Sequence, residues 1–297
     1  MTGAGGAVYD LGYEPYDGER RGRGGARSTI VGDGVRRVLG LRRKARRKIV
    51  PWMLIIIAVV PAIVAVGIVF FFPAGASDEF DLATNYGSFY VIGGTIALLF
   101  SGLAGPELLI PDRKDGVLSM LSSRPLTSSD YVIAKFASIL IVVGFFLLFP
   151  QLVLYIGEAG TDTDGILAGL VDAAPKLPRS LAVGAVYALT FVPPAFFVAG
   201  LAKRKAVASA TFIASMLMLS GIAEGLVRGA DFAGNRWFAL VAPFDTANAV
   251  NLWIFGESDP DSLLTYTGID PLIGLASIVA LAAVFVWLVL RRYQRLM

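Results

Sequence analysis

Six long runs of apolar residues, each without a charged side chain, dominate the pattern along this chain. Each run is close to the roughly 20 helical residues that cross the hydrocarbon core of a bilayer. No segment shows the ten-residue alternation of apolar and polar positions that a membrane barrel requires, so the runs predict helices. We therefore expect an all-α integral membrane protein with transmembrane helices at 51–72, 82–106, 136–157, 180–202, 206–223 and 271–290.

The positions of lysine and arginine predict how these helices face. With the N-terminus inside, all but four of the 26 lysines and arginines fall on the inner side, and the four exceptions are Lys176, Arg179, Arg228 and Arg236. Because inner loops of membrane proteins are enriched in these residues, the distribution predicts an N-in, C-in topology.

The residues before the first apolar run divide into two parts. Residues 1–32 are rich in glycine and arginine and predict a flexible cytosolic tail. Residues 33–50 predict an amphipathic interfacial helix, because apolar positions recur at helical spacing among basic ones that suit anionic headgroups. Its two faces are formed by Val35, Val38, Leu39 and Ile49 and by Arg36, Arg42, Arg43 and Arg46. The alternative is a plain stop signal for insertion that needs no helix.

The composition excludes several kinds of catalytic and metal site. Hydrophobic residues make up 56% of the 297-residue chain and charged residues only 16%, with no cysteine and no histidine. Thiolate nucleophiles, imidazole bases and most zinc or haem sites are therefore excluded. The sequence also lacks the Gly-Lys pair of a phosphate-binding P-loop. We expect no catalytic, cofactor-binding or metal-binding residue on this chain.

The segment 111–130, between the second and third apolar runs, predicts a cytosolic docking element. Pro111 and Asp112 are suited to start a short helix. That helix would carry an apolar stripe and end at Arg124-Pro125; the stripe comprises Val117, Leu118 and Leu121. A solvated connector is the alternative, although apolar residues facing water favour a partner.

The surrounding run from Glu107 to Lys135 resembles the first cytoplasmic loop of ABC exporter permeases. The shared pattern is an acidic-basic pair, a glycine, a leucine-rich turn, Ser-Arg-Pro, and a tyrosine and a lysine entering the next helix. Its positions here are Asp112, Arg113, Gly116, Leu118, Leu121, Ser123, Arg124, Pro125, Tyr131 and Lys135. Residues 9–23 are similar to the N-terminus of an actinobacterial subgroup of these permeases, and Ala242-Pro243-Phe244-Asp245 is similar to a weaker family feature. The N-terminal tail and the external segment 229–270 are longer than in many members.

The resemblance implies a permease subunit of an ATP-driven exporter, in the cell membrane, with a hydrophobic or amphipathic substrate. It would pair as a homodimer or heterodimer on two cytosolic P-loop ATPase subunits, which would hold ATP and Mg²⁺. The resemblance, together with the placement and apolar pattern of the loop, predicts a role in ATPase coupling for Glu107, Asp112, Arg113, Gly116, Val117, Leu118, Leu121 and Arg124. The stretch 237–255 would be a re-entrant external piece, with an ordinary external loop as the alternative. The other partner is the lipid bilayer, and no nucleic acid is expected.

Two other functions fit the same pattern. The chain could be a non-transporting membrane anchor that recruits a cytosolic partner through its basic tail, or a membrane enzyme acting on lipid. The docking element favours the permease over the anchor, and the missing histidine and cysteine weaken the enzyme. The substrate itself is not encoded in any recognisable pattern, since lipid-facing helices need the same apolar residues.

Overall fold

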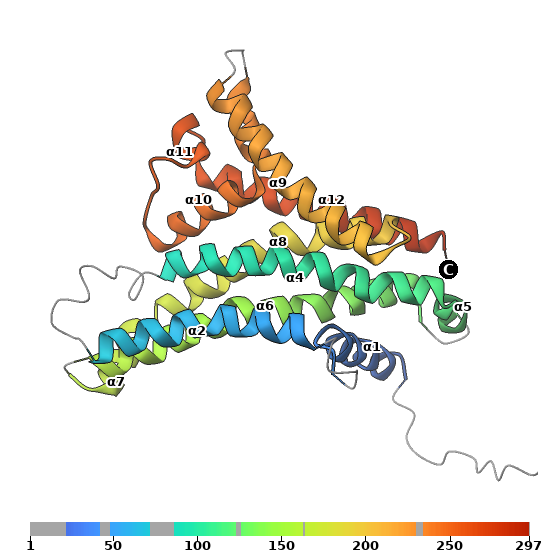
Figure 1. Ribbon diagram of the computed structural model, residues 1–297, viewed down its shortest axis with the longest axis horizontal. Helices are drawn as coiled ribbons and strands as arrows, with labels where there is room; N and C mark the ends of the chain where they lie inside the picture. The colour runs from blue at the N-terminus through green and yellow to red at the C-terminus, as the bar shows by residue number, and fades with distance from the viewer. Residues whose placement is uncertain are drawn as a thin grey trace, which may run out of the picture.

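The computed structural model describes residues 22–41, 48–71, 86–122, 126–162, 164–229 and 234–296, and these ranges contain helices and no strand (Figure 1). Six helices are long and apolar enough to cross a membrane, which confirms the all-α fold and the six predicted spanning helices. They are α2 (Ile49–Phe71), α4 (Tyr86–Lys114), α6 (Ser128–Thr161), α8 (Lys176–Leu201), α9 (Lys205–Gly229) and α12 (Pro271–Gln294). The chain is thus a candidate multi-pass membrane protein. The N-in, C-in orientation stays a prediction.

Shorter helices join or cover these six. They are α1 (Gly22–Val38), α5 (Val117–Ser122), α7 (Ile166–Ala173), α10 (Pro243–Phe255), α11 (Leu263–Thr267) and the 3₁₀ helix η3 (Asn235–Val241). In Figure 1, α5 and α7 lie at opposite ends of the bundle, and α10 and α11 lie beside α9. Helices η3 and α10 meet at 83°, so this apolar stretch is either a broken span or a re-entrant loop by its shape. Whether it enters a membrane stays a prediction.

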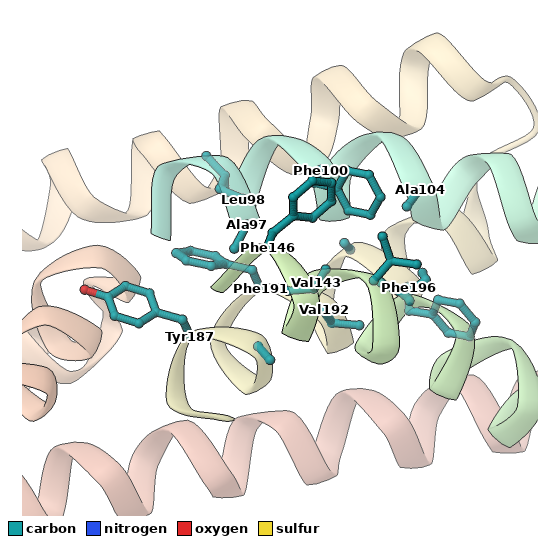
Figure 2. Close-up of a cluster of buried hydrophobic side chains, with 14 of the residues drawn as sticks. Ala97, Leu98, Phe100, Ala104, Val143, Phe146, Tyr187, Phe191, Val192 and Phe196 are labelled. Atoms are coloured by element: carbon teal, nitrogen blue, oxygen red, sulfur yellow. The ribbon is translucent and has the colours of Figure 1, made fainter. Parts of the chain in front are cut away.

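The core lies where α4, α6 and α8 pack together. These three are the most buried of the long helices, whereas few residues of α2, α9 and α12 are buried. Figure 2 shows aromatic side chains filling the centre, among them Phe100, Phe146 and Phe191. The rings of Phe100 and Phe146 meet edge to face with centroids 4.5 Å apart, an arrangement that favours aromatic pairs. The outer apolar faces are suited to lipid.

A glycine allows the close contact between α4 and α8. A Cβ added at Gly94 would lie 2.4 Å from Cε1 of Tyr187 on α8. Small residues at such points let membrane helices approach closely. We therefore expect Gly94→Ala to lower the free energy of unfolding by about 1–3 kcal/mol through overpacking, as measured by SDS titration in mixed micelles.

Gly144 on α6 provides the matched control, because a Cβ there would meet no atom within 4 Å. Gly144→Ala should leave stability unchanged or raise it slightly, since alanine favours helix over glycine. Equal effects of the two substitutions would contradict the role of close α4–α8 packing.

The N-terminal helix begins and ends at other residues than the sequence predicts. Helix α1 begins at Gly22, inside the segment 1–32 assigned to a flexible tail, and the segment 33–50 is not one helix. Gly40 has a φ of +67°. Leu41 N–H donates to the Arg36 carbonyl and Gly40 N–H to the Arg37 carbonyl. These bonds form the glycine-containing motif that commonly ends helices.

The residues of the predicted interfacial helix therefore separate into three groups. Val35, Val38 and Leu39 pack against the core through α4 and α6, while Arg36 is exposed. Ile49 is the first residue of α2. Arg42, Arg43 and Arg46 lie outside the described residues. The apolar face of α1 contacts protein, and its placement at a membrane surface stays a prediction.

Candidate coupling site at the end of α4

The predicted coupling residues lie at one end of the bundle, where α4 ends and α5 follows. Glu107, Asp112 and Arg113 are on the last turns of α4, and Gly116 forms the turn before α5. Val117, Leu118 and Leu121 are on α5. Arg124 lies outside the described residues, and so does the predicted end of the short helix at Arg124-Pro125.

The prediction that Pro111 starts the short helix is wrong. Helix α4 continues through Pro106 and Pro111 to Lys114, and Asp115 N–H donates to the Pro111 carbonyl over 2.8 Å. Gly116 then adopts a φ of +69°, which glycine reaches without steric cost, and α5 begins at Val117. Proline inside a spanning helix is tolerated when neighbouring groups satisfy the freed backbone.

Asp112 joins three helices through one buried carboxylate. It is 3% exposed and accepts from Arg37 Nη1 of α1 at 2.5 Å. It also accepts from Tyr131 OH at 2.9 Å, and Lys135 Nζ of α6 lies 2.9 Å away. Removing a carboxylate from water is costly unless charged partners and hydrogen bonds compensate it. Here two cations and a hydroxyl provide that compensation.

Arg37 stays charged in this cluster. Burial disfavours its positive charge, but the hydrogen bond and the negative charge of Asp112 outweigh burial, so the pKa of Arg37 lies above its ordinary value. A second carboxylate, Asp33, lies 3.7 Å from Arg37 Nη2 and is largely exposed. The guanidinium group in the contact between α1 and α4 therefore keeps its positive charge.

Two other charged residues of α4, Arg113 and Glu107, connect it to α8 and α9. Arg113 donates to the carbonyls of Ala199 at 2.6 Å, Ala202 at 2.7 Å and Gly200. The last carbonyls of a helix lack partners within it and attract positive charge, so Arg113 caps α8. Glu107 pairs with Lys205, the first residue of α9, at 2.5 Å. The end of α4 thus contacts α1, α6, α8 and α9.

Asp130 fixes the start of α6 and binds α1. Thr127 is the N-cap residue of α6, and it exchanges hydrogen bonds with Asp130 in a capping box. Arg23 Nε lies 2.6 Å from Asp130 Oδ2, and Arg27 pairs with the other oxygen. Sequence reasoning missed these two contacts. The spacing of the two arginines, one helical turn apart, was the available signal.

Leu118 does not lie where the sequence predicts. It is 8% exposed and belongs to the main hydrophobic core, so the expectation that it faces water and awaits a partner is wrong. Val117 is half-buried, and the Leu121 side chain lies outside the described part of the structure. Met120 of α5 is exposed, at 71%. The helix therefore turns Leu118 inward and Met120 outward.

A basic hollow lies between the end of α4 and the residues that join α8 to α9. Two cavities of about 370 and 350 Å³ are both lined by Ile110, Lys114 and Lys203. One adds Arg113 and Ala202, and the other adds Pro111, Asp115, Arg204 and Lys205. Lysines and arginines outnumber the single aspartate, so this surface is suited to an acidic partner.

Comparisons with known proteins give no match. No family model matches the chain, and no curated protein matches it. Within the described ranges, no group of three or more acidic side chains is placed to hold a metal ion.

Proposed function

We propose that this chain is the transmembrane permease subunit of an ATP-driven transporter of the ABC exporter type. It acts as a dimer of permeases on two cytosolic ATPase subunits, and it moves a hydrophobic or amphipathic substrate across the cell membrane. ATP hydrolysis takes place on the ATPase subunits, with Mg²⁺. The support comes from the sequence of the segment 107–135 and from the position of that segment in the bundle.

The observation that carries the proposal is the set of contacts at the end of α4. Asp112 binds Arg37 of α1 and Lys135 of α6, Arg113 caps α8, and Glu107 pairs with α9. Helix α5 follows α4 after two residues. A displacement of α5 by a partner would thus act on several helices through charged contacts and packed side chains, which carry coupling between distant sites. A plain membrane anchor has no need of such an arrangement.

The partner surface that we propose combines the outer side of α5 with the basic hollow at the end of α4. Met120 supplies an apolar contact, and Lys114 and Lys203 supply positive charge. The expected partner is a cytosolic P-loop ATPase with an apolar groove bordered by acidic residues. Leu118, which is buried within this chain, is not part of the contact.

The first test is ATP hydrolysis. The purified full-length chain should show no saturable ATP turnover, and turnover should require a separate P-loop ATPase that co-purifies from the same membranes. Finding a P-loop ATPase gene beside the gene for this chain would identify the protein to use. Saturable turnover by the chain alone would contradict the proposal.

The second test is Met120→Asp, which should reduce the amount of co-purified ATPase about tenfold or more. Burying a methionine contributes roughly 1.5–3 kcal/mol, and about 1.4 kcal/mol corresponds to a factor of ten. Leu167→Asp on α7 is the matched control, because Leu167 is an exposed apolar residue on a short helix at the opposite end. If Met120→Asp retains the ATPase as well as Leu167→Asp does, α5 is a connector and not a coupling element.

A further inference from the structure

A third cavity lies between α1, α2, α4 and α9, and it shares Lys205 with the basic hollow. It encloses about 440 Å³, within the range of about 300–1,000 Å³ typical of small-molecule sites. Its lining is largely apolar and includes Leu54, Phe100 and Leu103. Its charged residues are Arg37, Glu107 and Lys205. The positions of the apolar and the charged lining residues indicate which kind of ligand would fit the cavity.

The cavity is amphipathic along the direction of the helices. Arg37 is near the end of α1 and Lys205 is the first residue of α9, so both charges lie at helix ends. On α4, Phe100 precedes Glu107 by seven residues, about 10 Å at 1.5 Å per helical residue. The apolar part is therefore deeper in the bundle than the charged part. A ligand that fits needs a polar head and an apolar chain.

The charges around the cavity favour an anionic head. The lining of the cavity itself holds two cations, Arg37 and Lys205, and one carboxylate, Glu107. One positive charge is thus left over. Asp33 also approaches Arg37, but it is 60% exposed, and such exposed pairs contribute little. A guanidinium carries five N–H donors, and Arg37 gives one hydrogen bond to Asp112.

The cavity opens to the outer apolar surface of the bundle. Leu103 lines the cavity and is 42% exposed. Val50, at the start of α2, also lines the cavity and is exposed. Trp52 follows two residues later and is also exposed. Tryptophan favours the boundary between headgroups and hydrocarbon. These residues place the charged end of the cavity at headgroup level and its apolar part beside lipid chains.

We propose that this cavity binds one anionic phospholipid from the leaflet at this end of the bundle. The phosphate contacts Arg37 and Lys205, and one acyl chain lies along Leu54, Phe100 and Leu103. The bound lipid fills the space between α2 and α9 and holds α1 against the bundle. This site does not depend on an ATPase partner, so it stands or fails apart from the transporter proposal.

The test is native mass spectrometry of the detergent-solubilised full chain, titrated with phosphatidylglycerol or phosphatidylcholine of the same acyl chains. We expect one phosphatidylglycerol per chain, bound about tenfold more tightly than phosphatidylcholine, as one charge-assisted contact provides. Lys205→Gln should remove this preference. Lys203→Gln is its control, because Lys203 does not line this cavity.

A second pair of variants tests the cavity without changing charge. Ala206→Trp places a large side chain in the cavity and should abolish the single bound lipid, whereas Val207→Trp, on an exposed neighbour outside the lining, should not. Thermal unfolding in detergent confirms that each variant is folded. Equal binding of the two phospholipids would overturn the proposal. Unchanged binding in Ala206→Trp would do the same, as would displacement of the lipid by inorganic phosphate at equal concentration.

Discussion

Asp112→Asn should destabilise the chain by about 3–5 kcal/mol, the usual cost of removing one partner from a buried ion pair. Lys135 is buried as deeply as Asp112, and its Nζ lies 2.9 Å from the carboxylate. Asparagine would keep the shape but leave the ammonium group without a counter-charge. Its amide N–H₂ would also replace one of the two oxygens that accept from Arg37 and Tyr131. SDS titration in mixed micelles measures the loss.

Two controls separate this buried pair from ordinary surface charge. Asp33→Asn removes the exposed partner of Arg37 and should cost no more than about 1 kcal/mol. The double variant Asp112→Asn with Lys135→Gln should recover part of the loss, because no unpaired charge then stays buried. If the single and double variants are equally unstable, the packing of α4 against α6 matters and the ion pair does not.

Leu118→Asp should also destabilise the chain itself, by about 2–4 kcal/mol. The substitution loses the burial of a leucine, roughly 1.5–3 kcal/mol, and places a carboxylate against the hydrophobic core. Because Leu118 joins α5 to the bundle, the loss should appear in the purified chain without any ATPase present. The measurement is again the free energy of unfolding in mixed micelles.

Met120→Asp provides the comparison within the same helix. Its side chain is 71% exposed. The free energy of unfolding of this variant should therefore lie within about 0.5 kcal/mol of the wild-type value, as is usual for surface substitutions. The two variants thus distinguish the contribution of α5 to the stability of the chain from its contribution to ATPase binding. A stable Leu118→Asp chain that only loses its ATPase would contradict the buried position of Leu118.

The coupling segment illustrates what the pattern of apolar residues could not decide. Val117, Leu118 and Leu121 were correctly recognised as apolar residues between polar ones, but spacing alone does not tell whether they face the chain's own core or a partner. Leu118 belongs to the main hydrophobic core, which gathers residues from many parts of the chain. Similarly, Pro111 is suited to a first helical turn, yet the apolar run before it carries α4 onward to Lys114.

The N-terminal helix shows the same limit. Gly22 to Gly32 contains glycines and arginines and lacks a strong apolar stripe, so a flexible tail was the natural prediction. Helix α1 nevertheless forms there, because Arg23 and Arg27 bind Asp130, more than 100 residues away. Close packing also helps: a Cβ added at Gly34 would lie 2.2 Å from Ser138 Oγ. Its end at Val38 was readable in principle, since Gly40 closes the helix.

The sequence by itself determined the all-α class and the six spanning helices, because a bilayer requires about 20 apolar residues per span and full internal hydrogen bonding of the backbone. It also located the segment 107–135 as the place where charged and apolar residues gather. Only the tertiary structure decided which partners those residues have. Glu107, Asp112 and Arg113 contact four different helices, since pairing between charges depends on distances that folding sets and that spacing along the chain does not encode.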